Sequence, residues 1–412
     1  MSRSAAIYGL CVALLLPVLC VAQLNTLFSF NVSDGEGPQG VTLASGGLLF
    51  GSTALGGKWG HGAVYSLTPP ASATGAWSES LLYSFPGYRG DGADPLGTVV
   101  VGSAAAGRMV VFGLTYYKHR VGDGTVFSLT APASPGGAWT EELLHTFSVT
   151  PGDCSSPSEL VMGAGGVLYG IGFSGGAHSG GAVFSLTPPT STGGKWTETL
   201  IYSFGSAAGD GGDPTGLVMD GTGVLYGSTF GGGTANLGTV FSLKPPAAPG
   251  GVWQEAVLYS FQGSNDGSIA ANVSLGSGGV LYGTTAADGA SGNGTAFSLT
   301  PPASPGGAWT ESVLYQFPPS ATFGYGSVVP LVVGKNGVLY GGTFGANSGS
   351  SLFSLTPPAV PAGSWTENTL YSFTGLVGPW VTGLVRGPHG LLYGTTTPGG
   401  AGGYGTVFSF KP

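Results

Sequence analysis

One short motif recurs seven times along the chain. In each copy a leucine or valine precedes an aromatic residue and a glycine, and the seven glycines are Gly51, Gly113, Gly170, Gly227, Gly283, Gly341 and Gly394. Subtracting neighbouring positions gives a period of about 53 to 62 residues, which is typical of propeller repeats. Seven units of this length can close into a ring, so the repeat predicts a β-propeller.

The copy around Gly227 shows the parts of one repeat most clearly. Apolar residues 217–219 lead through a turn into residues 224–229, which are rich in β-branched and aromatic side chains. Two further strand patterns follow at residues 239–243 and 253–261. The 80 glycines and 29 prolines interrupt the chain too often for ordinary helices. We therefore predict an all-β fold, a seven-bladed β-propeller of four-stranded antiparallel blades.

The two ends of the chain indicate how the ring closes. Six tryptophans mark the outer strands of six repeats: Trp77, Trp139, Trp196, Trp253, Trp309 and Trp365. The last repeat stops at residues 407–410 with no such strand after it, whereas residues 24–30 match the tail of an outer strand, as at residues 81–85. We expect the N-terminal strand to complete the last blade and to leave no open edge.

Residues 1–22 differ from the repeats and are typical of a secretory signal peptide. Arg3 precedes an apolar run over residues 5–19, and small residues follow where a signal peptidase requires them. Cleavage would leave residues 23–412 as a single propeller, secreted or held at the cell surface, with no transmembrane helix. A retained membrane anchor is the alternative, although the run is short for a bilayer span.

Cysteines and sequons add little to the question of compartment. Cys11 and Cys20 lie in the signal segment, so Cys154 remains alone and an intramolecular disulfide is excluded in the mature chain. We expect Cys154 to be a free, buried or half-buried thiol rather than a nucleophile. Three sequons would carry glycans if the host is eukaryotic and the loops are exposed: Asn31, Asn272 and Asn293.

Charge is sparse and negative. Charged residues make up 7% of the chain and the formal net charge is −8, which disfavours binding to nucleic acid. The abundance of glycine and hydroxyl side chains instead suits a neutral surface that contacts sugars or packs in a matrix. A glycan, a cell-wall component or an extracellular matrix is therefore the expected partner.

Several repeated units resemble a known family. Residues 223–227 and 279–285, followed by a pattern such as residues 238–243, resemble the GloVer tandem-repeat family over nearly all of the mature chain. The resemblance implies a propeller in a secreted or surface-anchored protein. It supplies no set of catalytic residues.

Residues that recur in every repeat are explained by packing and turns. We expect the glycine of each second strand to permit close approach of the backbone, and the glutamates two places after the tryptophans to be solvated. Asp-Gly turns at residues 91–95 and 210–214 offer oxygen ligands that suit calcium, but Asp-Gly is first a turn signal. We predict no cofactor, with calcium as the alternative.

Function is sought where the repeats depart from their consensus, and one loop departs most. Residues 115–123 carry aromatic and basic side chains where other copies are rich in glycine. Aromatic faces stack on sugars, and cations pair with carboxylate or sulfate, so a site for an acidic glycan is predicted on the first three blades. Its candidate residues are Lys58, Trp59, His61, Tyr116, Tyr117, Lys118, His119, Arg120 and His178. The competing interpretation is a variable surface loop with no ligand.

The sequence thus favours a secreted, non-catalytic propeller that binds or scaffolds. The first alternative is a polysaccharide lyase in which Tyr117, His119, Arg120 and His61 neutralise a uronate and move its proton. Paired aspartates for glycoside hydrolysis also stay open, because sequence does not fix their separation. The chain lacks a Gly-x-Ser-x-Gly elbow with triad partners, a phosphate loop and paired-cysteine metal spacing. The second alternative is a structural wall or matrix component.

Overall fold

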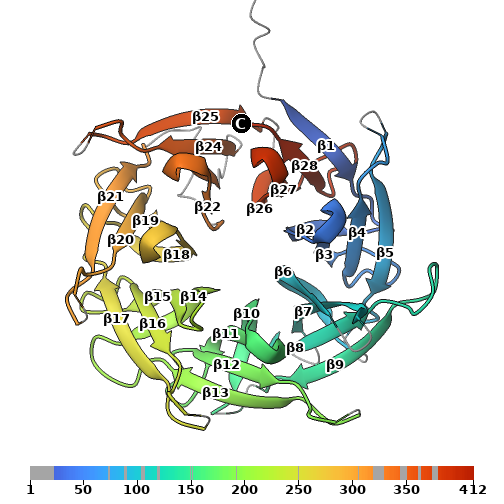
Figure 1. Ribbon diagram of the computed structural model, residues 1–412, viewed down its shortest axis with the longest axis horizontal. Coiled ribbons are helices and arrows are strands. Elements are labelled where there is room, and N and C mark those ends of the chain that lie inside the picture. Colours follow the sequence, from blue (N-terminus) through green and yellow to red (C-terminus); the bar gives the residue numbers. More distant parts are fainter. Residues whose placement is uncertain are drawn as a thin grey trace, which may run out of the picture.

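Seven antiparallel sheets of four strands form the fold, and Figure 1 shows them as blades around a central axis. The computed structural model describes residues 23–412 except 73–74, 88–90, 104–106, 118–120, 149, 151, 192, 249, 305, 319–328, 344–349, 361–362 and 374–378. The first strand of each blade lies innermost and the last strand lies at the rim (Figure 1). The predicted all-β, seven-bladed propeller is confirmed.

The strands of the first four blades follow the chain in order. Blade 1 contains β2 (Glu36–Leu43), β3 (Leu49–Leu55), β4 (Ala63–Thr68) and β5 (Ser78–Ser84). Blade 2 contains β6 (Ala93–Ser103), β7 (Met109–Tyr117), β8 (Val121–Thr130) and β9 (Thr140–Thr146). Blade 3 contains β10 (Cys154–Met162), β11 (Leu168–Gly175), β12 (Ala182–Thr187) and β13 (Thr197–Ser203). Blade 4 contains β14 (Gly211–Met219), β15 (Leu225–Gly232), β16 (Thr239–Lys244) and β17 (Gln254–Ser260).

The last three blades complete the ring. Blade 5 contains β18 (Ser268–Leu275), β19 (Leu281–Ala287), β20 (Thr295–Thr300) and β21 (Thr310–Gln316). Blade 6 contains β22 (Val332–Val333), β23 (Leu339–Gly342), β24 (Ser351–Thr356) and β25 (Thr366–Ser372). Blade 7 contains β26 (Trp380–Arg386), β27 (Leu392–Thr397), β28 (Thr406–Phe410) and β1 (Leu24–Ser29). Single 3-10 turns join first and second strands at η1 (Ser45–Gly47), η3 (Ala164–Gly166), η4 (Ser277–Gly279), η5 (Lys335–Gly337) and η6 (Pro388–Gly390).

Strand β1 closes the ring as predicted. It pairs antiparallel with β28, from Leu24 opposite Phe410 to Ser29 opposite Thr406. The sheet order is β1-β28-β27-β26, so the outer strand of blade 7 comes from the other end of the chain. Figure 1 shows the C-terminal end of the chain beside β1.

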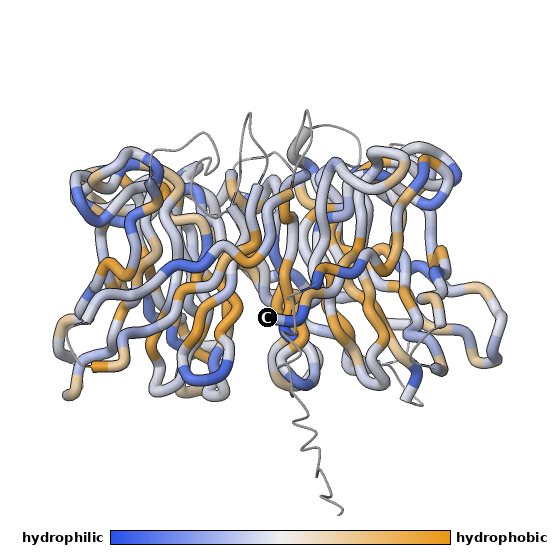
Figure 2. The backbone as a smooth tube through the Cα atoms, turned by 90° about the horizontal axis from the view of Figure 1, so that it is seen from above, coloured by the Kyte–Doolittle hydropathy of each residue, from blue (hydrophilic) through white to orange (hydrophobic). Residues whose placement is uncertain are grey.

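The path of the chain gives the ring two distinct faces. The turns between second and third strands and the connections between blades lie on one face, which we call the mouth face. The 3-10 turns and the loops between third and fourth strands lie on the other, which we call the base face. Figure 2 shows the ring from the side, with loops gathered above and below the strands.

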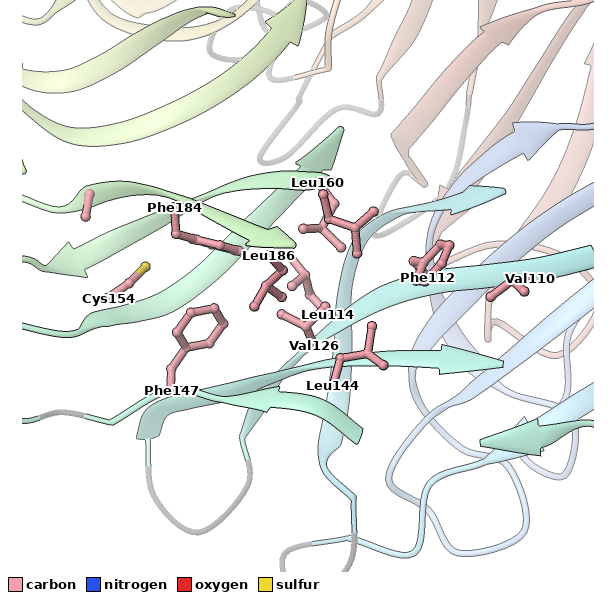
Figure 3. Close-up of a cluster of buried hydrophobic side chains, with 12 residues drawn as sticks. Val110, Phe112, Leu114, Val126, Leu144, Phe147, Cys154, Leu160, Phe184 and Leu186 are labelled. Atoms are coloured by element: carbon pink, nitrogen blue, oxygen red, sulfur yellow. The ribbon is translucent and has the colours of Figure 1, made fainter. Parts of the chain in front are cut away.

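Paired aromatic rings join each blade to the next. The phenylalanine after each outer strand packs on an aromatic residue in the third strand of the following blade. The ring centroids of Phe85 and Phe127 lie 5.0 Å apart. Those of Phe30 and Tyr65, which join blade 7 to blade 1, lie 4.9 Å apart. Such edge-to-face pairs add about 0.5–1.5 kcal/mol to burial. The other pairs are Phe147–Phe184 (Figure 3), Phe204–Phe241, Phe261–Phe297, Phe317–Phe353 and Phe373–Phe408.

The recurring glycine of the second strand makes room for these rings. A Cβ atom at Gly227 would lie 2.4 Å from the carbonyl oxygen of Gly216 and 2.4 Å from the Phe241 ring. The first contact is the close backbone approach that the sequence predicted. The second contact shows that the glycine also accommodates an aromatic side chain of its own blade.

Gly227→Ala is expected to lower the free energy of unfolding by about 1–3 kcal/mol, because the added methyl group overpacks against backbone. Urea denaturation of the variant and the wild type measures the difference. Gly221→Ala is the matched control, since a Cβ atom at Gly221 in the same blade meets nothing within 4 Å. Equal stability of Gly227→Ala and the wild type would contradict this packing account.

Candidate functional site

A cavity of about 810 Å³ opens on the mouth face over blades 3 to 5. The residues that line it lie in the turns that follow β11, β15 and β19, in the connection between blades 3 and 4, and at the start of β14 and β18. This volume is typical of sites that bind small molecules. Its lining includes His178, Asp213, Phe230, Asn236 and Asp288.

Two glycines frame each turn on this rim. Gly233 and Gly238 have φ values of 77° and 97°, which L side chains rarely adopt. The N–H of Gly233 donates to the carbonyl oxygen of Asp210 at 2.8 Å, which fixes the start of the turn. Four residues lie between the two glycines, and they decide what blade 4 presents. The same six-residue frame recurs at 57–62, 176–181, 289–294 and 400–405.

Asp213 enters the cavity from a left-handed position near the start of β14. Its φ is 56°, and its N–H donates to the Gly180 carbonyl of blade 3 at 2.7 Å. Its Oδ2 lies 4.0 Å, and the Oδ1 of Asn236 lies 3.8 Å, from the point where a side chain at Gly231 would begin. Oxygen atoms from two elements therefore face one small space. Burial raises the pKa of Asp213.

Asn236 and Asp288 complete the polar part of the cavity. Both have left-handed backbone, with φ values of 57° and 56°. The Oδ1 of Asn236 accepts a hydrogen bond from the N–H of Gly232 at 3.0 Å, which directs the side chain back over its own turn. The carboxylates of Asp213 and Asp288 accept hydrogen bonds, and the amide of Asn236 can donate them. The cavity thus presents groups that match the hydroxyls of a polar ligand.

Exposed Phe230 gives the cavity an apolar edge and pairs with a second exposed phenylalanine, Phe173. Phe230 is 44% exposed and Phe173 is 37% exposed, and their ring centroids lie 6.3 Å apart in an edge-to-face pair. Each lies three residues after the recurring glycine of its second strand, and Tyr116 holds the same position in blade 2. Aromatic side chains therefore follow the mouth from blade 2 to blade 4.

The charge of this cavity is negative. Its lining carries the carboxyl groups of Asp210, Asp213 and Asp288, whereas His178 is its one basic side chain among the residues described there. Asp210 also holds its own loop, since its Oδ2 accepts hydrogen bonds from the N–H and hydroxyl of Ser206 at 2.9 and 3.0 Å. The carboxylates of Asp213 and Asp288 make no such hydrogen bond within the described structure and are available to a ligand.

The residues predicted from the sequence fall into separate groups. His178 is exposed and lines the cavity. On blade 1, the Lys58 ammonium lies 4.5 Å from the centre of the Trp59 ring, and Trp59 is 54% exposed. His61 is half-buried, and a Cβ atom at Gly87 would meet its ring at 2.5 Å.

Blade 2 supplies the remaining predicted residues. Tyr116 and Tyr117 are half-buried and form an edge-to-face pair with centroids 4.7 Å apart. Lys118, His119 and Arg120 lie outside the described residues. The described members of the blade 1 and blade 2 groups do not line the cavity over blades 3 to 5.

Sequence reasoning missed Asp213, Phe230, Asn236 and Asp288 as one site. In the sequence, Asp213 belongs to an Asp-Gly turn pattern and the turn after Phe230 is rich in glycine, so neither departs from the repeat. The sequence signal that could have indicated this site is Phe230, because the same strand position is alanine in blade 1 and blade 5. The left-handed backbone that directs the polar groups has no comparable signature.

A profile of the Gloeobacter/Verrucomicrobia repeat matches residues 16–209 and 192–408. The chain belongs to this repeat family. The match covers almost the whole propeller and confirms the resemblance to GloVer repeats. No curated protein matches the chain at a significant level.

Solved structures similar to this family member share its fold at low sequence identity. A catalytically inactive variant of virginiamycin B lyase from Staphylococcus aureus has a TM-score of 0.56 and 13% identity, over 95% of this chain and 99% of that one. The extracellular domain of the hybrid two-component system BT4673 from B. thetaiotaomicron has a TM-score of 0.53 and 10% identity, over 94% of this chain and 39% of that one.

Among the described residues, the structure contains no apolar helix of the length that a bilayer span requires.

The repeated glutamates of the outer strands are not solvated as expected. Glu79, Glu198, Glu255 and Glu311 are half-buried, and the shielded Oε1 of each makes no hydrogen bond within the described structure. Burial, reinforced by a nearby aspartate, raises the pKa of each to about 7. The outer strand therefore shields one carboxyl oxygen of each glutamate from water.

The Asp-Gly turns have a local structural role. Asp266, like Asp210, closes the connection between two blades, and its Oδ2 accepts hydrogen bonds from the N–H of Gln262 at 2.9 Å and the hydroxyl of Tyr259 at 2.8 Å. A search of the described residues finds no group of three or more His, Cys, Asp or Glu side chains able to hold a metal ion. These aspartates therefore work as turn caps.

Cys154 and the sequons occupy contrasting positions. Cys154 is a free and fully buried cysteine, and burial raises the pKa of its thiol well above the usual value.

Asn31 is exposed, but its side chain forms hydrogen bonds with Asp34 and Ser33 in a turn. Asn272 lies within the innermost strand β18, beside Gly216 of the preceding blade, and Asn293 is half-buried in a mouth-face turn.

Proposed function

We propose that this protein is a secreted, non-catalytic propeller that recognises a neutral carbohydrate through the cavity over blades 3 to 5. The observation that supports this most is the combination of exposed Phe230 with the oxygen atoms of Asp213, Asn236 and Asp288 around one cavity. An aromatic face packs on the apolar side of a sugar ring, while carboxylate and amide groups bind its hydroxyls. The carboxylates would repel uronates and sulfated sugars.

An extended glycan could also reach the residues predicted from the sequence. Tyr116 and Phe173 continue the aromatic row from Phe230 toward blade 2. A chain of sugars on this row would approach Tyr117 and the neighbouring loop, and then the Lys58–Trp59 pair of blade 1. We therefore place the primary contacts on blades 3 to 5 and secondary contacts on blades 1 and 2.

The proposed location is extracellular or at the cell surface. Residues 1–22 have the pattern of a signal peptide. The fold also occurs in the extracellular domain of BT4673, although that likeness concerns the fold alone. The proposed mature protein is a propeller over residues 23–412.

Phe230→Ala is expected to weaken binding to the recognised glycan about tenfold, through loss of roughly 1.4 kcal/mol of stacking. A glycan microarray with neutral and acidic members identifies the ligand, and titration calorimetry gives the dissociation constants. Val252→Ala is the matched control, because Val252 lies in the same blade, is 86% exposed and belongs to a base-face loop. It should bind as the wild type does.

Further variants distinguish the possible sites and functions. Loss of binding in a Tyr117→Ala/Lys118→Ala variant but not in Phe230→Ala would move the site to blade 2. Turnover of the bound glycan would favour the lyase alternative, for which Tyr117, His119, Arg120 and His61 are the candidates. No binding to any displayed glycan would refute the proposal for those sugars and favour a structural wall or matrix role.

A further inference from the structure

The junction between blades 6 and 7 lacks an aromatic–tryptophan contact that the other six junctions have on the base face. In the other six junctions, the aromatic residue of the second-strand motif packs on the tryptophan that precedes the next outer strand. The pairs are Phe50–Trp139, Phe112–Trp196, Tyr169–Trp253, Tyr226–Trp309, Tyr282–Trp365 and Tyr393–Trp77. The equivalent residue of blade 6 is Tyr340, and the next outer strand is β1.

The register of β1 explains the absence of a tryptophan partner. Leu24 pairs with Phe410, just as Glu79 pairs with Leu67 in blade 1. The position of Trp77 therefore falls at residue 22, which is alanine and lies outside the described residues. Closing the ring with the N-terminal strand thus leaves Tyr340 without the indole that covers its counterparts.

A basic recess occupies this junction. It has a volume of about 130 Å³ and lies on the base face, between the turns η5 and η6. We call it the junction recess, and its lining includes Lys335, Tyr340, Arg386, His389 and Lys411. Arg386 and Tyr340 are half-buried, whereas the other three side chains are exposed.

The basic residues of the junction recess break the repeat. The position of Arg386 is apolar in the other six blades: Leu43, Val101, Met162, Met219, Leu275 and Val333. His389 stands at the left-handed position of its turn, where η1, η3 and η4 have glycine. Lys335 begins a turn that starts with serine or alanine in η1, η3 and η4. Independent departures from the consensus therefore meet at one place.

These charges have no anionic partner within the described structure. The chain has 11 lysines and arginines and a formal net charge of −8, yet three of these cations gather here with a histidine. None of the four basic side chains forms an ion pair or hydrogen bond with a described residue. Like charges at short range repel one another, and a bound anion would remove that repulsion.

We propose that the junction recess binds one anionic group, a carboxylate, sulfate or phosphate, presented by a small ligand. Its volume suits a single such group, and the planar guanidinium of Arg386 can bind two of its oxygens while the lysines add charge. A free oxyanion and an acidic sugar residue both carry this chemistry. A lipid surface does not fit, because the net charge of −8 opposes approach to an anionic membrane. This site is separate from the mouth-face cavity.

Arg386→Gln is expected to weaken binding of sulfate and inorganic phosphate at least tenfold. Titration calorimetry at constant ionic strength measures the dissociation constants of sulfate and phosphate. The same titration is repeated with a sulfated disaccharide and a uronic disaccharide. Tighter binding of a disaccharide than of the free ions identifies the ligand as an acidic sugar, and equal binding identifies a free oxyanion. Lys335→Gln, at an exposed turn, provides a second variant if Arg386→Gln fails to fold.

The chain contains a matched control for the lysines. Lys244 occupies in blade 4 the position that Lys411 occupies in blade 7, so Lys244→Gln should leave sulfate binding unchanged while Lys411→Gln weakens it. Equal affinity in the wild type and in both Arg386→Gln and Lys335→Gln would overturn the proposal. Stronger binding to vesicles of anionic phospholipid than to soluble anions would also overturn it. Phe230→Ala should retain sulfate binding, which separates this test from that of the glycan site.

Discussion

Removing residues 23–30 is expected to abolish the cooperative unfolding transition of the wild type or to lower the midpoint of thermal unfolding by more than about 10 °C. The deletion leaves β28 as an open edge along its whole length, because β1 is its only outer partner in the described sheet. It also removes Phe30, which is 1% exposed and packs on Tyr65 of blade 1. Loss of a buried phenylalanine alone costs about 3–5 kcal/mol.

Differential scanning calorimetry and circular dichroism measure this effect. The matched control is a protein that lacks only residues 1–22, which keeps β1 and should retain the cooperative unfolding transition. A circular permutant that attaches residues 23–30 after Pro412 tests the cause, because Leu24 and Phe410 are paired neighbours at the base face. Recovery of stability in the permutant would attribute the loss to the missing strand. An unchanged transition after the deletion would contradict closure of the ring by β1.

Stability is expected to fall as the pH rises from about 5 to about 8. Burial raises the pKa of Glu79, Glu198, Glu255 and Glu311 from 4.5 to about 7 in the folded protein, and Glu159 in β10 behaves likewise. A raised pKa means that the folded state holds the proton more tightly than the unfolded state. Its stabilising contribution is therefore complete below about pH 4.5 and is lost as the pH passes through 7.

The size of this pH effect depends on solvent screening. Because Glu79, Glu198, Glu255 and Glu311 are half-exposed, we discount the contribution of each to ~1 kcal/mol. Together they amount to ~4 kcal/mol, or about 5 °C in the unfolding midpoint for a chain of this size. Replacing all four with glutamine should flatten the pH dependence, whereas Glu142→Gln, at an exposed position on β9, should not. A midpoint that rises between pH 5 and pH 8 would contradict the burial argument.

The sequence was sufficient for the fold because its strongest signals repeat. The motif around Gly227, the tryptophan of each outer strand and the unmatched strand at residues 24–30 together specified the number of blades and the closure. The outer-strand glutamates were misjudged for the same reason. A repeated charged residue on a rim strand implies solvent, whereas the side chain at Glu79 turns inward.

The site was harder to predict because its geometry depends on backbone conformation and on contacts between blades. The left-handed φ of Asp213 and the turn of Asn236 bring atoms together from elements more than twenty residues apart. The junction recess depends on a residue that is missing from a strand at the other end of the chain. A composition outlier such as the loop of blade 2 is visible in sequence, but a convergence of ordinary residues from several blades is not.

The six-residue glycine frame of the mouth turns implies that the four residues inside one frame can be exchanged for those of another. Five blades enclose four residues between glycines of similar backbone conformation, and the aromatic rings that join the blades lie outside these frames. A turn transplanted from one blade to another would therefore carry its side chains to a new place on the rim without disturbing the scaffold. The ring of blades is thus a constant scaffold, and the order of the turns around it determines the shape of the ligand that fits.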